Sequence, residues 1–237
     1  MKVDSKLFCA LLLTLAGLTG CAEILSELQI EGPADSATPT DGLREALRVG
    51  TGRAVEQLGR TDGYLGNAEV RIPVPDKVEN VAKALRTIGA GHVVDEFVTS
   101  MNRAAEAAAP LAKTVFVDTV RGMTFSDAVA ILRGKDHEAT DYLRQNAGPR
   151  LAELFQPIVA DKLDAVGATR SFEELVSRAE KLPFVRRPVF DLDGYVTGEA
   201  LDGLFEMIAR EEEKIRKDPV ARTTELLRKF FGENARY

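Results

Sequence analysis

The amino-acid sequence predicts an all-α fold, a compact bundle of about ten helices. From Gly42 onward, apolar residues recur at every third or fourth position, as they do along one face of an α-helix. Only the stretches 69–75 and 184–190 have an extended pattern, and the prolines within them disfavour long strands. Helix-start signals precede many of the periodic segments. Together these observations predict helices along almost the whole chain after Gly42.

The first three helices are predicted from residue spacing and from local end signals. In 42–58, small and apolar residues fall on one helix face. The second helix follows Asp76, where Glu79 completes a capping box. The third carries an apolar stripe over 94–108, and its alanines indicate a close approach between helices. Pro110 ends or kinks this third helix.

Seven further helices are expected at 111–121, 125–133, 137–146, 149–166, 172–181, 198–216 and 219–231. Their starts are signalled by Thr124 with Asp127, Ser171 with Glu174, Thr197, and Asp218 followed by Pro219. The irregular stretches at 59–75 and 183–193 are short for linkers between domains. We therefore expect a single α-helical domain over 42–237.

The stretch 1–20 has the pattern of an export signal. Lys2 and Lys6 precede the uncharged run 7–20, which is too short to cross a bilayer, since a spanning helix needs about 20 apolar residues. The sequence LTGC that ends at Cys21 resembles the lipobox of bacterial lipoproteins, and this resemblance implies cleavage before that cysteine and its acylation by chains such as palmitate. Two or more acyl chains make a stable membrane anchor.

The stretch 21–41 is expected to form the acylated cysteine and a flexible polar tether. Ala22 stands where an aspartate would favour the inner membrane, so the lipoprotein sorting rule indicates the periplasmic side of the outer membrane. Cys9 is lost with the signal, so the mature chain keeps only Cys21 and cannot form a disulfide within itself. Loss of 1–20 changes the net charge from −6 to −7, and an acidic chain without a basic cluster disfavours nucleic acid as a partner.

Metal and phosphate motifs are incomplete, so we expect no metal and no cofactor. The stretch 190–201 partly matches a calcium loop, but Glu199 lies one residue short of the bidentate position, which favours a turn and a helix N-cap at Thr197. His137 and Asp141 share a helix face, whereas a zinc site needs three or four ligands.

Two other polar stretches have structural alternatives. The glycine-rich stretch 59–67 follows a helix rather than a strand, which disfavours a phosphate loop and leaves the rim of a ligand pocket as an alternative. The stretch 210–218 is expected to be a solvated, charged helix face.

The candidate pocket residues are Asn102, Arg103 and Glu106. Asn102 lies at the edge of an apolar helix stripe, and Arg103 and Glu106 are spaced as an i,i+3 ion pair. They form either a solvated pair or part of a polar pocket between helices. A nucleophile–base arrangement is not recognisable, so the catalytic residues, if there are any, stay unidentified.

Several long blocks resemble one bacterial envelope family, which is known only as domain of unknown function 4197. The blocks are 44–75, 101–110, 127–134, 139–144, 195–205 and 211–227. The resemblance implies an α-helical exported protein, often a lipoprotein, and it brings no activity, cofactor or catalytic residue.

These inferences favour a non-enzymatic, lipid-anchored protein that binds an envelope protein or a small apolar ligand. The membrane would be reached through the acylated Cys21. The alternative is a carboxylate- or metal-dependent envelope hydrolase that uses residues such as Glu106, Asp118, His137 or Asp141. That alternative requires several of these side chains to converge in one concave pocket.

Overall fold

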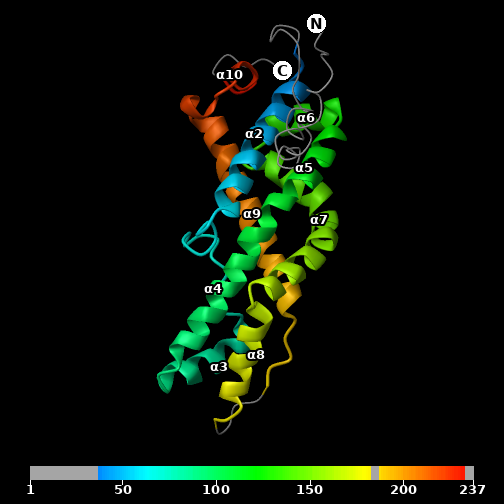
Figure 1. Cartoon of the computed structure of the whole chain (residues 1–237). Coiled ribbons are helices and arrows are strands. Elements are labelled where there is room, and N and C mark those ends of the chain that lie inside the picture. Colours follow the sequence, from blue (N-terminus) through cyan, green and yellow to red (C-terminus); the bar gives the residue numbers. More distant parts are fainter. Residues whose placement is uncertain (1–36, 183–186, 233–237) are drawn as a thin grey trace, which may run out of the picture. The chain divides into compact units, whose positions relative to one another are not determined.

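The computed structural model describes residues 37–182 and 187–232, which all lie within one compact unit of the chain. These residues form helices and no strand, so the predicted all-α class is confirmed. The eight longer helices are α2 (Pro39–Gly59), α3 (Asp76–Thr87), α4 (Gly91–Ala108), α5 (Ala112–Arg121), α6 (Phe125–Arg133), α7 (Glu138–Ala165), α8 (Ala168–Ala179) and α9 (Leu192–Lys217). The short helix α10 (Glu225–Phe231) and the 3₁₀ turns η2 (Ala109–Leu111) and η3 (Pro219–Ala221) complete the described part (Figure 1). The expected number of about ten helices was therefore too high.

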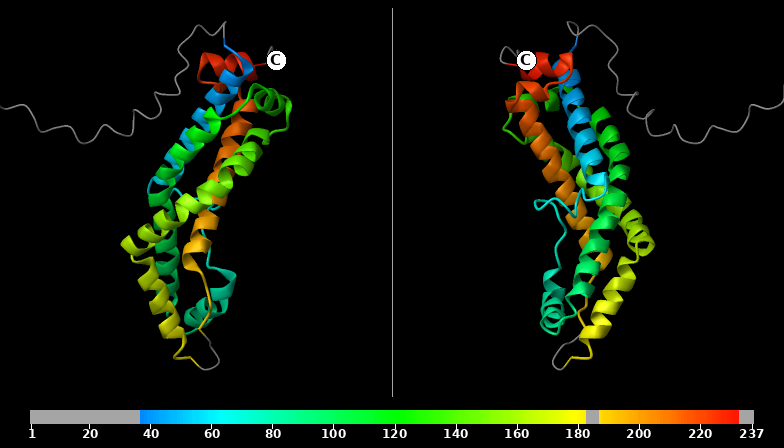
Figure 2. Two further views of the ribbon diagram at one scale, coloured as in Figure 1. Left: turned by 90° about the vertical axis from the view of Figure 1, so that its right-hand side faces the viewer. Right: turned by 60° about the vertical axis from the view of Figure 1, so that its left-hand side comes forward.

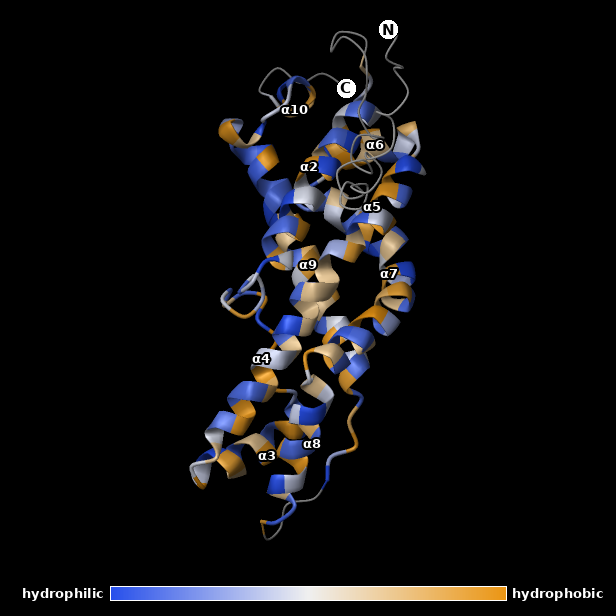
Figure 3. Ribbon diagram, viewed as in Figure 1, coloured by the Kyte–Doolittle hydropathy of each residue, from blue (hydrophilic) through white to orange (hydrophobic). Residues whose placement is uncertain are grey.

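Helix α9 is the main packing partner of both α7 and α2, and α4 packs against α7 and α8. Figures 1 and 2 show α3 and α8 at one end of this bundle and α6 and α10 at the other. Apolar and polar residues alternate along each helix, as expected for helices that bury one face (Figure 3). Among the described residues, no helix is both long enough and apolar enough to cross a membrane. The predicted signal peptide 1–20 and Cys21 lie outside the described residues.

Helix α2 begins before the predicted end of the tether. The tether was expected over 21–41 and the helix from Gly42, but α2 begins at Pro39. The Thr38 hydroxyl accepts a hydrogen bond from the Asp41 backbone N–H (3.3 Å), and the Asp41 carboxylate accepts one from the Thr38 N–H (2.8 Å). This reciprocal capping box satisfies two backbone donors and fixes the start of the helix.

The two helices predicted at 137–146 and 149–166 are one continuous helix, α7. Pro149 and Pro157 lie inside it, although a proline removes a backbone hydrogen bond and usually ends a helix. Both prolines are exposed. On its buried face, α7 carries an apolar residue at every fourth position, namely Leu143, Ala147, Leu151, Phe155, Val159 and Leu163. Packing of this stripe against α4, α5 and α9 keeps the segment helical across both prolines.

Two predicted capping residues are inside their helices. Asp76 is the first residue of α3, and its N-cap is Pro75, so the expected capping box with Glu79 does not form. Ser171 lies in the first turns of α8, which starts after Gly167. Gly167 has a φ of 76°, a left-handed conformation that glycine adopts without a steric penalty.

The predicted start and extent of α6 are confirmed. The Thr124 hydroxyl accepts a hydrogen bond from the Asp127 N–H (3.2 Å), and the Asp127 carboxylate accepts one from the Thr124 N–H (3.0 Å). The helix spans 125–133, as predicted from its sequence. The hydrogen bonds from Thr124 hold the pKa of the Asp127 carboxyl below its usual value.

The helix predicted over 219–231 is divided into η3 and α10. Asp218 caps the first piece by accepting a hydrogen bond from the Val220 N–H (2.8 Å). Thr224 caps the second piece by accepting one from the Leu227 N–H (3.3 Å). Two successive capping residues therefore give two short elements in place of one helix.

The two stretches predicted as extended are not strands where they are described. In 69–75, the first two residues belong to a turn and 71–75 has no regular secondary structure. In 184–190, the residues 187–190 are also irregular, and the remainder lies outside the described residues.

Candidate functional site

The connection 60–75 between α2 and α3 is a long irregular segment whose backbone is fixed by buried polar side chains. In Figure 1 it is the cyan trace that follows α2. Irregular connections longer than roughly 12–15 residues are uncommon in compact domains and are usually functional or disordered. The fixed backbone of this segment, which we call the braced loop (60–75), makes it the principal candidate for a functional surface.

Asn102 on α4 holds the second half of the braced loop. Its side-chain oxygen accepts a hydrogen bond from the Ile72 N–H (2.9 Å), and its side-chain nitrogen donates to the carbonyl oxygens of Ile72 (2.9 Å) and Val98 (2.8 Å). Asn102 and Ile72 are both fully buried. One amide therefore satisfies both backbone groups of Ile72 away from water.

Glu106 on α4 holds the first half of the braced loop. One carboxylate oxygen accepts hydrogen bonds from the N–H groups of Tyr64 (3.2 Å) and Leu65 (3.1 Å). The other accepts from the Arg103 guanidinium (2.6 Å), which also donates to Asp62 (2.8 Å). These two hydrogen bonds raise the pKa of Arg103. Because Asp62 has a left-handed φ of 65°, rare for residues other than glycine, its link to Arg103 fixes an uncommon conformation.

Tyr64 attaches the braced loop to α9. Its hydroxyl donates a hydrogen bond to the carbonyl oxygen of Ala200 (2.6 Å), and the side chain is fully buried. Burial, assisted by the charge of Glu106, raises the pKa of Tyr64 far above its usual value, so the hydroxyl stays protonated as a donor. Gly203 permits the contact, since a Cβ there would lie 2.9 Å from the Tyr64 ring.

The three candidate pocket residues therefore lie together beneath the braced loop. Arg103 and Glu106 also line an open hollow of about 510 Å³, together with Thr61 and Ser100. All polar atoms of the Asn102 side chain are bonded to backbone groups. The visible role of the three residues is to fix the loop, and a role in binding a ligand stays a prediction.

A second open hollow, of about 700 Å³, separates the braced loop from α9. The loop contributes Arg60, Asp62, Asn67 and Glu69, and α9 contributes Arg210, Glu213, Lys214 and Lys217. Glu69 forms an ion pair with Arg210 across the hollow. The lining thus carries both signs of charge.

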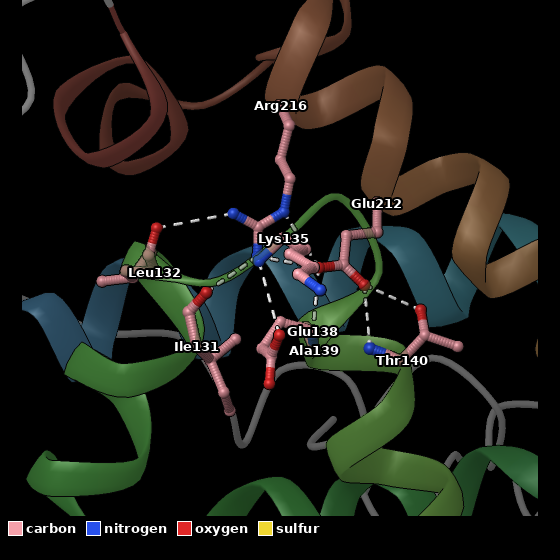
Figure 4. A network of polar contacts seen from close by, with 8 residues as sticks. All are labelled: Ile131, Leu132, Lys135, Glu138, Ala139, Thr140, Glu212 and Arg216. Carbon is pink, nitrogen blue, oxygen red and sulfur yellow. Dashed lines mark hydrogen bonds and ion pairs between the residues drawn. The ribbon is translucent and has the colours of Figure 1, made fainter.

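Glu212 and Arg216 on α9 form a buried clamp on the turn between α6 and α7 (Figure 4). The Glu212 carboxylate accepts hydrogen bonds from the N–H groups of Ala139 (3.0 Å) and Thr140 (2.8 Å), which are donors at the start of α7. Arg216 donates to Glu212 (2.8 Å) and to the Ile131 carbonyl near the end of α6 (2.9 Å). A carboxylate at a helix N-terminus and a cation at a helix C-terminus both complement the helix dipole.

The stretch 210–218 was predicted to be wholly solvated, and this is wrong for its inward side. Glu211 and Glu212 are buried, with 5% and 8% of their surfaces exposed. The apolar Ile208 and Ile215 lie on the same helix face, at i and i+7. This spacing is the sequence signal that identifies the buried side of the helix.

Of the four residues of the hydrolase alternative, only His137 and Asp141 line the same hollow. Glu106 lies beneath the braced loop, and Asp118 on α5 pairs with Arg150 on α7 (3.6 Å). His137 and Asp141 line a separate hollow of about 500 Å³ beside α9. Among residues 37–182 and 187–232, no group of three or more histidine, cysteine or carboxylate side chains is arranged to hold a metal ion.

The stretch 190–201, which resembles part of a calcium loop, is the start of α9. The N-cap is Asp191, which accepts a hydrogen bond from the Gly194 N–H (2.9 Å), and not Thr197 as predicted. Asp193 lies in the first helical turn. Burial, followed by the charges of Asp191 and Asp164, raises its pKa.

A further hollow, between two of the described helices, is more enclosed than those above, and it is apolar and very small. It lies between α2 and α9, includes Leu43, Leu47, Ile208 and Phe231 in its lining, and holds about 10 Å³. A single water molecule needs about that much space. This void cannot hold a small apolar ligand without displacement of the side chains around it.

The fold and the candidate site together define an all-α protein in which buried hydrogen bonds hold a long loop to α4 and α9, with open hollows beside the loop. The family model described as "Protein of unknown function (DUF4197)" matches residues 34–232. The chain belongs to this family, as the resemblance of the sequence blocks indicated. No curated protein and no solved structure matches the chain.

Proposed function

We propose that this protein is a lipid-anchored, non-enzymatic binding protein on the periplasmic side of the outer membrane, and that its partner is another envelope protein. The braced loop is the proposed contact surface. The observation that carries this proposal is that one side of the loop is bonded to the helices while the other side presents exposed charged residues. Tyr64 and Ile72 are fastened to the bundle, while Arg60, Asp62 and Glu69 are exposed.

A loop with a fixed backbone loses little conformational entropy when it binds a partner. The open hollow of about 700 Å³ beside the loop has charged groups of both signs among its lining residues, which suits the mixed surface of a protein. The void of about 10 Å³ between α2 and α9 gives no comparable support to the small apolar ligand. The separate positions of the candidate carboxylates likewise give no support to a hydrolase.

Site-specific crosslinking in cells tests the proposed surface. A photoreactive residue in place of Ala68, which is exposed on the braced loop, is expected to give a discrete adduct with one envelope protein. The matched control is the same residue in place of Glu153, which is exposed on α7. Adducts would be identified by mass spectrometry. Absence of an adduct from position 68, or the same adduct from both positions, contradicts the proposal.

The anchor has its own test. In a Cys21→Ala variant, the acyl acceptor is missing, so incorporation of labelled palmitate is expected to be lost. We also expect the variant to be found either as an unprocessed precursor or outside the outer-membrane fraction. The measurement is metabolic labelling followed by membrane fractionation. Normal processing and unchanged outer-membrane association of the variant would refute the lipid anchor.

A further inference from the structure

The exposed side of α9 carries a line of alternating charges. The charged line is Glu206, Arg210, Glu213 and Lys217, which follow one another at steps of four, three and four residues. Residues at this spacing share one helix face. Between 38% and 55% of each of these side chains is exposed. The charges therefore alternate in sign along a single accessible strip.

The charged line is held in place from both sides. Arg210 bonds to Glu206 within the line (3.0 Å) and to Glu69 of the braced loop. Lys217 bonds to Glu213 within the line (2.7 Å) and to Asp136 at the turn before α7 (2.6 Å). These contacts restrict long side chains that would otherwise lose conformational freedom on binding.

The charged line also remains open to a partner. Arg210 and Glu213 contribute to the lining of both flanking hollows, of about 700 and about 500 Å³. The half-exposed groups keep bonding capacity, since a guanidinium has five N–H donors, an ammonium three, and a carboxylate about four acceptor sites. A second layer of ion pairs can form on top of the first.

The order of the charges is self-complementary. If two copies of α9 lie face to face and antiparallel, Glu206 of each copy faces Lys217 of the other, and Arg210 faces Glu213. All four positions then meet the opposite charge around one two-fold axis, as a closed isologous dimer requires. A parallel arrangement in register places every charge opposite its equal, which is repulsive.

We infer that the charged line of α9 is a homodimerisation surface that binds the same surface of a second copy of this chain, antiparallel, through complementary charges. Charge pairs at a partly exposed surface specify the orientation of partners more than they add affinity. The dimer is therefore expected to be reversible and to weaken as salt screens the pairs.

A charge-swap experiment tests this inference. The detergent-solubilised full chain is expected to sediment with twice the protein mass of one chain at an ionic strength of roughly 0.05 M, and with less at roughly 0.5 M. Arg210→Glu and Glu213→Arg are each expected to sediment as monomers, because each sets like charges opposite one another. An equimolar mixture of the two variants is expected to regain the doubled mass, since each then faces the opposite charge.

The matched control is Arg178→Glu on α8, which reverses the charge of an exposed arginine that, like Arg210, pairs with a glutamate four residues earlier. This variant is expected to leave the sedimenting mass unchanged. Far-ultraviolet circular dichroism establishes that each variant is folded. Monomeric wild-type protein at low salt overturns the inference. So do folded single variants that still dimerise, or a mixture that stays monomeric.

Discussion

Replacement of Glu212 by alanine is expected to destabilise the protein by about 3–5 kcal/mol, because it leaves a buried charge without its partner. The side chains of Glu212 and Arg216 are only 8% and 12% exposed. Without the carboxylate, Arg216 retains backbone carbonyl partners but loses the carboxylate with which it is directly paired. The N–H groups of Ala139 and Thr140 also lose their acceptor at the start of α7.

The measurements are urea unfolding, which gives the free energy, and thermal unfolding, which gives the melting temperature, each followed by circular dichroism. For a chain of this size, 1 kcal/mol corresponds to a change in melting temperature of roughly 2–4 °C, so a loss of about 10 °C is expected. The matched control is Glu174→Ala, which breaks a pair of the same type and spacing with Arg178 on α8. Because 44% of each control side chain is exposed, that loss is expected to stay below about 1 kcal/mol.

A double variant distinguishes the energy of the ion pair itself from the energy of the contacts that Glu212 and Arg216 each make with other groups. Glu212→Ala with Arg216→Ala is expected to cost less than the two single losses added together, because removal of both charges leaves neither unpaired. Equal losses for Glu212→Ala and Glu174→Ala would show that the clamp does not stabilise the turn between α6 and α7. Strict additivity would show that the two side chains act independently.

The sequence was sufficient for the fold class but not for the continuity of its helices. The periodicity of Leu143, Leu151 and Phe155 is visible in the sequence, yet the two helices predicted there leave a break at 147–148, directly before Pro149. Whether a proline ends a helix depends on which side it faces and on the packing of the opposite side. Those are properties of the tertiary structure, so local signals alone divided α7 in two.

The candidate site was predictable in its members but not in their arrangement. Asn102 lies at the edge of an apolar helix stripe, and Arg103 and Glu106 have the i,i+3 spacing of an ion pair, so the sequence alone indicates all three. Their partners include Tyr64, which lies 42 residues before Glu106, and Ile72, which lies 30 residues before Asn102. Contacts at such separations leave no periodic signal in a single sequence, so the braced loop could be identified only in three dimensions.

The second large effect is expected from Asn102→Asp, which replaces a buried amide donor with an acceptor. At neutral pH the new carboxylate oxygen would face the carbonyl oxygens of Ile72 and Val98, where the amide nitrogen now donates at 2.9 and 2.8 Å. This oxygen would have no hydrogen-bond donor, and burial of an unpaired charge destabilises the folded state. We expect a loss of about 3 kcal/mol at pH 7, with the part of the braced loop around Ile72 released first.

The loss is expected to depend on pH in a defined direction. Burial raises the pKa of the introduced carboxyl in the folded state above the value of about 3.9 in the unfolded chain. The folded state then binds the proton more tightly, so the variant gains stability as the pH falls through the raised folded pKa and loses it as the pH rises. Relative to wild type, the expected slope approaches about 1.4 kcal/mol per pH unit between the two pKa values.

Two measurements, with one control, distinguish release of the braced loop from a general loss of stability. Urea unfolding between pH 5 and 7.5 gives the slope, and limited trypsin digestion reports opening of the loop through cleavage after Arg60 or Arg71, which are exposed. The control is Asn146→Asp on α7, where an exposed amide makes the same i−4 bond to Tyr142 (2.8 Å). There water can solvate the charge, so little loss and little pH dependence are expected. If the two variants show equal pH profiles and equal digestion, the amide of Asn102 is not what fixes the loop, and the rigid surface on which the proposed function rests has another origin.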